Sequence, residues 1–75
     1  MEENLIKLFR ETLEIEDREI SVNDAFRDYP EWDSLALLSV IAMIDDEYDI
    51  IIEGNDFAKL KTIGELIDTI KKMQA

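Results

Sequence analysis

The sequence contains no histidine and no cysteine among its 75 residues. Histidine is the commonest general base and a common metal ligand, and cysteine supplies the thiol of many nucleophilic enzymes, so the usual side chains of such sites are missing. Disulfide bonds are excluded as well. A chain of this length also has little room to enclose a substrate while burying a core. We therefore expect neither an enzyme nor a metal site.

Basic residues are scarce too. Eight lysines and arginines stand against 19 aspartates and glutamates, which gives a net charge of −11. Such a charge repels nucleic acid and anionic lipid, so we expect basic protein partners. The acidic excess lies in residues 1–56, with 17 acidic and four basic residues, whereas residues 57–75 have two acidic and four basic ones. The recognition surface is therefore expected in the first three quarters of the chain.

Long hydrophobic runs are also missing. The longest mostly apolar stretch, Leu35–Ile44, is interrupted by Ser39 and is too short to cross a bilayer, and the N-terminus has no signal-peptide pattern. Hydrophobic residues nevertheless make up 47% of the chain, which is enough for a packed core. We expect a soluble, cytoplasmic monomer with no membrane span.

Helical periodicity marks both ends of the chain. Apolar residues recur at i, i+3 and i+4 spacing over residues 5–13 and again over residues 63–70. Thr62 and Glu65 form a T-x-x-E capping box that predicts where the last helix begins. These two segments are the first and last long helices of the predicted fold.

A third long helix is predicted from Ser34 to about Tyr48, because this run contains neither glycine nor proline and follows Asp33, a good N-cap residue. Its helical wheel places one stripe toward the core, comprising Leu37, Val40, Ile41, Ile44 and Tyr48. A second group should point away from the core, comprising Ala36, Ser39, Met43, Asp46 and Glu47. The flank beside the serine carries Leu35, Leu38 and Ala42.

The segments between these helices lack a helical period. Residues 14–33 are interpreted as a long loop in which Pro30 excludes a continuous helix. Isolated apolar residues should pin this loop to the core, namely Ile15, Ile20, Val22 and Phe26. Residues 50–52 are interpreted as a buried, extended segment, and Asp56–Leu60 as one short helical turn.

The predicted fold is therefore all-α, a small four-helix bundle with three long helices and one short one in a single domain over residues 1–75. The expected core comprises Leu5, Phe9, Leu13, Leu37, Ile41, Ile44, Tyr48, Ile63, Leu66, Ile67 and Ile70.

Asp33-Ser34-Leu35 is the motif that bears on function. A phosphate ester on the Ser34 hydroxyl would lie at a helix N-terminus, where backbone N–H groups and the positive end of the helix dipole favour an anion. The same tripeptide is also an ordinary helix start, with Asp33 as the cap and Ser34 as a polar residue in the first turn. The motif alone does not separate these two interpretations.

The wider pattern resembles the acyl and peptidyl carrier protein family. The resemblance is carried by Phe26, Asp33-Ser34-Leu35, the segment from Ile44 to Ile50, Ile52, and Thr62-Ile63-Gly64-Glu65-Leu66. It implies that Ser34, flanked by Asp33 and Leu35, receives 4′-phosphopantetheine from coenzyme A through a separate magnesium-dependent phosphopantetheinyl transferase. It also implies that the arm then holds acyl or aminoacyl thioesters, loaded by ligase or synthase enzymes.

The resemblance further implies a surface for partner enzymes on the long middle helix. Leu38 is similar to an apolar contact position of the family, and we assign Ala42, Met43, Asp45 and Asp46 to the same surface. Met43 could instead be an isolated apolar residue of the outer face. The run Asp45-Asp46-Glu47 has two interpretations, a solvated helix end or a docking site.

Neighbouring residues leave further alternatives. The loop acids could dock partners instead, namely Asp24, Asp28 and Glu31. We expect Leu35 to pack under the long loop rather than contact a partner. We also expect Trp32 to anchor that loop by burying its ring.

The sequence departs from the family pattern just after the serine. Carriers of fatty acid synthesis typically have acidic residues early in this helix, whereas Ala36 and Ser39 are found here. We therefore expect a specialised pathway, of polyketide, peptide or modified-lipid type, rather than housekeeping fatty acid synthesis. The alternative is an unmodified acidic helical adaptor that binds a basic protein.

Overall fold

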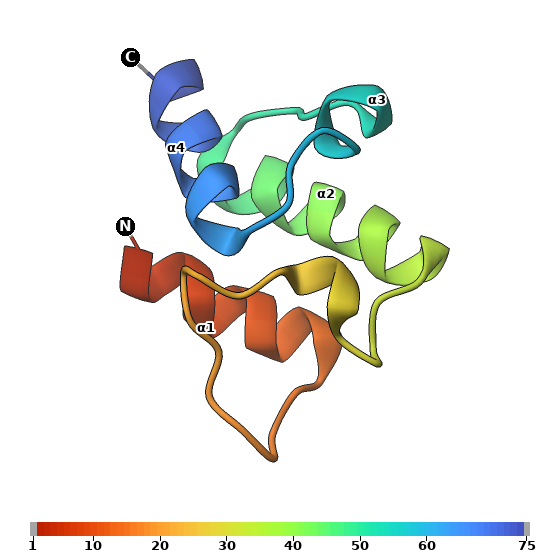
Figure 1. Ribbon diagram of the computed structural model, residues 1–75. Coiled ribbons are helices and arrows are strands. Elements are labelled where there is room, and N and C mark those ends of the chain that lie inside the picture. The colour runs from red at the N-terminus through yellow and green to blue at the C-terminus, as the bar shows by residue number, and fades with distance from the viewer. Residues whose placement is uncertain (1, 75) are drawn as a thin grey trace.

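The computed structural model describes residues 2–74 and consists of helices and connections (Figure 1). The elements follow in the order α1 (Glu2–Leu13), the short 3₁₀ helix η1 (Phe26–Asp28), α2 (Ser34–Tyr48), α3 (Gly54–Phe57) and α4 (Ile63–Gln74). Three helices are long and α3 is a single turn, so the predicted all-α bundle is confirmed.

The arrangement of the helices places the start of α2 away from both chain ends. In Figure 1 the two termini lie on one side of the molecule, and α2 begins on the opposite side. Helix α1 packs against both α2 and α4. The long connection after α1 passes over that helix, forms η1 and then reaches the start of α2. The position of Ser34 therefore depends on how this connection is held.

The core draws side chains from every helix and from both long connections. The predicted core residues of α1 and α4 are all buried, as is Ile44 of α2. Leu37, Ile41 and Tyr48, which the prediction placed in the core, are only half-buried against it. The buried set comprises Leu5, Phe9, Leu13, Ile15, Ile20, Phe26, Ala36, Val40, Ile44, Ile50, Ile52, Phe57, Ile63, Leu66, Ile67 and Ile70.

The buried face of α2 is rotated relative to the prediction. Ala36, expected to point outward, is only 7% exposed and forms the inward row with Val40 and Ile44. Met43, also expected on the outer face, is half-buried against the core. Both expectations were wrong because the connections and α3, besides α1 and α4, contribute core side chains. These extra neighbours bring a different side of α2 into the interior.

The connection between α1 and α2 is held as predicted, with Ile15, Ile20 and Phe26 buried and Val22 half-buried. Its η1 turn was not predicted. Backbone hydrogen bonds also tie the connection to the start of α4. The Ile63 N–H donates to the Asp24 carbonyl at 3.2 Å, and the Gly64 N–H donates to the Val22 carbonyl at 2.8 Å.

Gly64 permits this close approach. A Cβ atom at this position would lie 3.1 Å from the Val22 carbonyl oxygen, which is tighter than most real Cβ contacts. A larger residue would therefore push the connection away from α4.

The α2–α3 connection is extended, as predicted, and alternates in exposure. Ile50 and Ile52 are buried, whereas Ile51 between them is 64% exposed. Helix α3 begins at Gly54 rather than at Asp56 as predicted, because the first helical hydrogen bond runs from the Phe57 N–H to the Glu53 carbonyl. The turn places Phe57 in the core.

Side chains cap the short segments around α3 and α4. The Arg27 guanidinium of η1 donates to the Leu60 carbonyl at 3.0 Å and to the Phe57 carbonyl at 2.6 Å, which joins η1 to the end of α3. The predicted capping box of α4 is present, since the Glu65 N–H donates to Thr62 Oγ1 at 3.1 Å. The Glu65 carboxylate in turn accepts from the Lys61 N–H at 3.3 Å.

Helix α1 ends on a residue with left-handed backbone. Glu14 has φ 57°, and the following Ile15 N–H bonds back to the Arg10 carbonyl at 2.9 Å, which is the Schellman pattern that usually carries glycine. Replacing Glu14 by glycine removes the Cβ penalty, so Glu14→Gly should raise the free energy of unfolding by about 0.5–1 kcal/mol. Urea denaturation measures this change. Glu16→Gly, in the same connection without positive φ, should be neutral or destabilising; equal stabilisation by both would contradict the explanation.

Candidate functional site

Asp33 caps α2 and sets the residue at which the helix begins. Its backbone is extended, with φ −150° and ψ −173°, and its carboxylate accepts the Ala36 N–H at 2.7 Å. The Leu37 N–H makes the first helical bond, to the Asp33 carbonyl at 3.0 Å. Ser34 is therefore the first residue of α2, as predicted. The N–H groups of Ser34 and Leu35 belong to the first turn, where a helix provides no acceptor.

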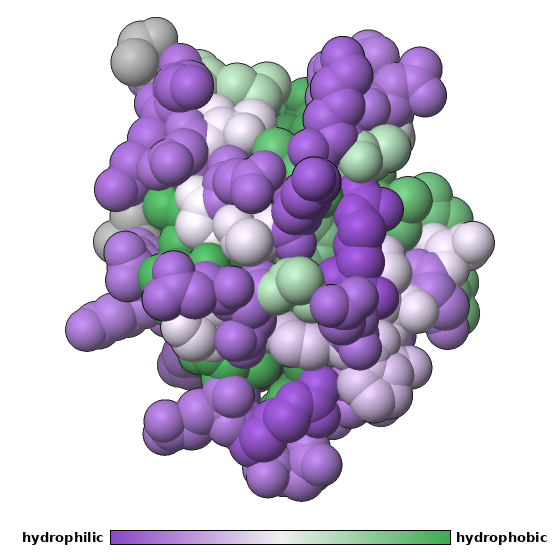
Figure 2. Space-filling model, viewed as in Figure 1, coloured by the Kyte–Doolittle hydropathy of each residue, from purple (hydrophilic) through white to green (hydrophobic). Residues whose placement is uncertain are grey.

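Ser34 is exposed, and the apolar residues beside it are exposed as well. Leu35 is 71% exposed and Leu38 is 63% exposed. The expectation that Leu35 packs under the long loop was wrong, because Ala36 takes the inward position and each residue turns the helix by about 100°. Figure 2 shows apolar surface at the edge of the molecule where α2 begins, next to hydrophilic side chains.

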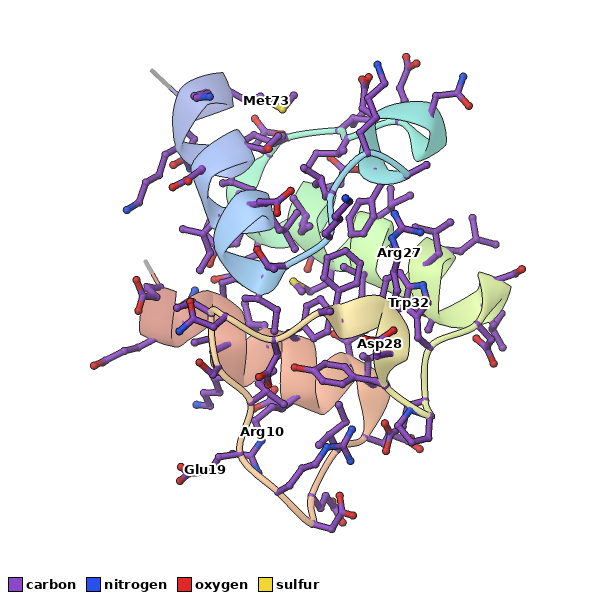
Figure 3. All side chains as sticks on the ribbon, in the orientation of Figure 1. Arg10, Glu19, Arg27, Asp28, Trp32 and Met73 are labelled. Atoms are coloured by element: carbon purple, nitrogen blue, oxygen red, sulfur yellow. The ribbon has the colours of Figure 1, made fainter. Side chains whose placement is uncertain are left out.

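Trp32 fixes the chain two residues before the serine. Its ring lies parallel to Phe9 of α1 at 6.1 Å and close to parallel with Phe57 of α3 at 5.9 Å. It also meets Phe26 of η1 edge-on at 4.8 Å. Such pairs contribute about 0.5–1.5 kcal/mol each beyond area burial. The half-buried Trp32 thus anchors the loop, as expected, and its place beside η1 and α2 is visible in Figure 3.

A chain of polar contacts stiffens the same connection. Arg18 donates two hydrogen bonds to Glu31, at 3.1 and 2.7 Å, and its guanidinium lies 5.1 Å from the centre of the Tyr29 ring. The Tyr29 hydroxyl donates to the Asp24 carboxylate at 2.8 Å. Hydrogen bonding from Arg18 lowers the pKa of Glu31, whereas burial and the bond to Asp24 raise the pKa of Tyr29.

These contacts separate the acidic residues into two groups. Asp24 and Glu31 are engaged within the connection, so two of the three loop acids considered for docking serve the fold. Asp28 is exposed. On α2, the exposed residues beyond Leu38 are Ser39, Ala42, Asp45, Asp46 and Glu47.

The acids of α2 stand at an unfavourable position. They occupy the C-terminal end of the helix, where the dipole disfavours negative charge, and no basic residue offsets them in the last turn. The first turn, where acids would stabilise the helix, has none. This distribution costs helix stability.

Ser34 offers an exposed hydroxyl for esterification. The sequence provides no histidine, and within residues 2–74 no group of three or more carboxylates is placed to hold a metal ion. An exposed hydroxyl at a helix N-terminus can instead be esterified by another protein. A phosphate ester there would face the N–H groups of the first turn, so the residues present fit a phosphopantetheine arm.

The comparisons with known proteins agree with this geometry. Residues 3–70 match the family model described as "Phosphopantetheine attachment site". The chain is 29% identical to the acyl carrier protein of Rhodococcus erythropolis over 92% of this chain and 76% of that protein. It is also 29% identical to the meromycolate extension acyl carrier protein of Mycolicibacterium smegmatis, over 93% of this chain and 71% of that one.

Solved structures show the same fold. A Mycobacterium tuberculosis chain assigned as an acyl carrier protein superposes with a TM-score of 0.82 at 30% identity, covering 96% of both chains. The solution structure of the holo acyl carrier protein of Geobacter metallireducens superposes with a TM-score of 0.80 at 25% identity, covering 95% of this chain and 82% of that one.

The chain therefore belongs to the family of phosphopantetheine-binding carrier proteins. It is an acyl carrier protein that bears a covalent phosphopantetheine arm, and it is not an enzyme. The predicted family, fold, cofactor and carrier function are confirmed, and the unmodified adaptor is not favoured. Carrier proteins of this kind work with transferases and synthases. Among residues 2–74 there is no helix both long and apolar enough to cross a bilayer.

The Arg18–Glu31 pair makes stability depend on pH in a defined direction. The pKa of Glu31 is lower in the folded protein than its ordinary value of about 4.5, so its contribution is present above that value and lost as pH falls through the folded pKa. Arg18→Met should therefore reduce stability at neutral pH, and the difference from the natural sequence should narrow below about pH 4. Urea denaturation at a series of pH values measures the free energy of unfolding of both proteins. Lys7→Met, an exposed substitution on α1, is the control. If the difference in free energy of unfolding between Arg18→Met and the natural sequence stays the same at low pH, the assignment to Glu31 is wrong.

Proposed function

We propose that Ser34 is the residue to which the phosphopantetheine arm is attached. This rests on the exposure of Ser34 as the first residue of α2, next to the Asp33 cap. In the transfer, the Ser34 oxygen forms a bond to the phosphorus that carries pantetheine in coenzyme A. The pyrophosphate bond of coenzyme A breaks, adenosine 3′,5′-bisphosphate leaves, and the hydroxyl proton passes to a base of the transferase.

The residues around Ser34 hold this site without taking part in the chemistry. Asp33 keeps the helix start in place through its bond to the Ala36 N–H. The backbone N–H groups of Ser34 and Leu35 would face the phosphate of the arm and favour its negative charge. The arm supplies a thiol that holds cargo as a thioester, and tethering raises the effective concentration of that cargo at a partner's active site.

The partner surface we propose runs along the exposed side of α2. Leu35, Leu38 and Ala42 supply an apolar strip that begins beside Ser34, and Asp45 and Asp46 follow at the other end. A rise of 1.5 Å per residue puts these acids about 17–18 Å along the helix from Ser34. A partner with an apolar patch flanked by basic residues would match both the apolar strip and the two acids. Met43 contributes less, because it is half-buried in the core.

The partners we propose are a phosphopantetheinyl transferase and the ligase or synthase enzymes that load and use the cargo. A specialised lipid pathway is supported by the absence of acidic residues from the first turn of α2 and by relatives named meromycolate extension acyl carrier proteins. We further propose that residues 1–75 act as a single, monomeric carrier domain in the cytoplasm. These assignments follow from the charge, the missing disulfides and the compact bundle.

Modification at Ser34 can be tested directly by mass. Incubation of the apo protein with coenzyme A and a broad-specificity phosphopantetheinyl transferase should add one phosphopantetheine group, and Ser34→Ala should abolish the addition. Intact-protein mass spectrometry measures both. Ser39→Ala, an exposed serine further along the same helix, should be modified at the normal rate. Full modification of Ser34→Ala would refute the assignment.

The two halves of the proposed partner surface should act differently in the same reaction. Leu38→Ala should lower kcat/KM for modification by about tenfold at any salt concentration, since it removes an apolar contact. The double change Asp45→Asn with Asp46→Asn should slow association mainly at low salt. Initial rates over a range of ionic strength separate these effects. Rates equal to those of the natural sequence in both variants would rule out this surface for the transferase.

A further inference from the structure

A groove lies between α1 and the start of the connection that follows it. Residues of α1 from Glu3 to Glu11 line one part of the groove, and Glu14–Glu16 line the rest. Its volume is about 640 Å³, within the range of about 300–1,000 Å³ that is typical of ligand sites. None of its lining residues belongs to α2. The groove is therefore separate from the surface around Ser34.

The groove is also on a different side of α1 from the core. Leu5, Phe9 and Leu13 form the buried row of this helix. Each residue turns the helix by about 100°, so Lys7 and Arg10 point to another side than that row. In Figure 3 Arg10 lies below α1, whereas α4 lies above it. A molecule in the groove would leave α2 uncovered.

The lining of the groove combines apolar side chains with an excess of acidic ones. Ile15 is 2% exposed and Ile6 is half-buried. Four exposed glutamates line the groove, and its only basic residues are Lys7 and Arg10, which gives the lining a net charge of −2. This charge disfavours an anionic ligand. A basic ligand that also carries apolar groups would match both features.

Arg10 adds a requirement for a hydrogen-bond acceptor. Its Nε atom is buried, and no atom of residues 2–74 accepts a hydrogen bond from it. A buried donor without a partner costs free energy, so a ligand that supplies an acceptor would remove that cost. A peptide carbonyl is such an acceptor, and it has no net charge for the glutamates to repel.

We propose that this groove binds a basic peptide segment of a partner protein. From Glu3 to Glu14 the groove extends about 16–17 Å along α1, which about five residues of extended chain would span. Basic side chains of the peptide pair with the glutamates, apolar ones cover the two isoleucines, and a carbonyl accepts from Arg10. The inference goes beyond the proposed function, because a partner held here leaves α2 and the arm free for other enzymes.

The natural sequence is tested first, in its unmodified form. The probe is the peptide Lys-Leu-Lys-Leu-Lys with both ends blocked, and ¹⁵N–¹H NMR spectra follow the backbone amides of the protein as peptide is added. Amides of residues 3–16 should shift, whereas those of α2 should stay in place. Shifts confined to Asp45 and Asp46, or no shift at millimolar peptide, would overturn the proposal.

Two other occupants are tested in the same spectra. Sodium octanoate that shifts the amides of residues 3–16 at a lower concentration than the peptide does would show that the groove prefers an anion. Shifts of these amides with protein concentration alone would assign the groove to a second copy of the chain. Either result would overturn the assignment to a basic peptide.

Two double variants of equal charge test which acids bind the peptide. Glu11→Gln with Glu16→Gln should raise the Kd of the peptide about fivefold at physiological salt, because two exposed ion pairs are lost. Asp45→Asn with Asp46→Asn removes the same charge from α2 and should change this Kd less than about twofold. Equal effects of the two double variants would indicate attraction by net charge alone and would refute the site.

Arg10→Lys separates the hydrogen bond from the charge. Lysine keeps the positive charge but has no Nε donor, so the Kd of the peptide should rise about threefold. An unchanged Kd would refute the role given to Arg10.

The outcomes distinguish this proposal from the carrier function. The NMR spectra also establish that each variant is folded, and the titration of the natural sequence decides the matter for any variant that is not. Because the unmodified protein is used, a chain that accepts no phosphopantetheine would refute the carrier site at Ser34 without affecting peptide binding. A chain that is modified normally but binds no peptide would refute the groove alone.

Discussion

The packing of Trp32 between Phe9 and Phe57 is the interaction on which the site depends. The 20 residues that separate α1 from α2 include only one short 3₁₀ turn, so helix geometry alone does not position them. Buried aliphatic side chains hold the middle of this connection, and Trp32 holds its end. With the chain fixed there, Asp33 can cap α2 and leave Ser34 exposed as its first residue. The packing of Trp32 thus positions the Asp33 cap, and the cap leaves the Ser34 hydroxyl accessible.

Polar residues of the connection between α1 and α2 help to hold the fold. Arg18, Glu31, Tyr29 and Asp24 bond to one another within the connection. On α2, Glu47 accepts a hydrogen bond from Asn4 of α1 at 3.5 Å, whereas Asp45 and Asp46 lie near the C-terminus of the helix, where the helix dipole opposes their charge. The charged residues near η1 therefore support the fold, whereas Asp45 and Asp46 of α2 are exposed.

Much of this structure could be predicted from residue patterns, because periodicity and caps are local signals. The helical spacing of α1 and α4 identified their buried faces, and Asp33 and Thr62 identified two helix starts. The rotation of α2 could not be predicted in the same way. Ala36 is small and compatible with either face, so its burial depends on which distant side chains pack against it.

Other features had no pattern to reveal them. Phe57 lies in a short stretch without a helical period, so nothing in the neighbouring residues showed that its ring would contact Trp32. Arg18 and Glu31 are 13 residues apart in an irregular loop, and their pairing has no sequence signature. The exposed serine was predicted correctly, whereas the aromatic packing of Trp32 required the three-dimensional arrangement.

The central claim is that the exposed hydroxyl of Ser34 carries the arm in the living cell. It is tested most directly by isolating the protein from its natural source, digesting it and fragmenting the modified peptide in a mass spectrometer. The whole phosphopantetheine mass should lie on Ser34. Fragments that place the group on Ser21, Ser39 or any other residue would contradict it.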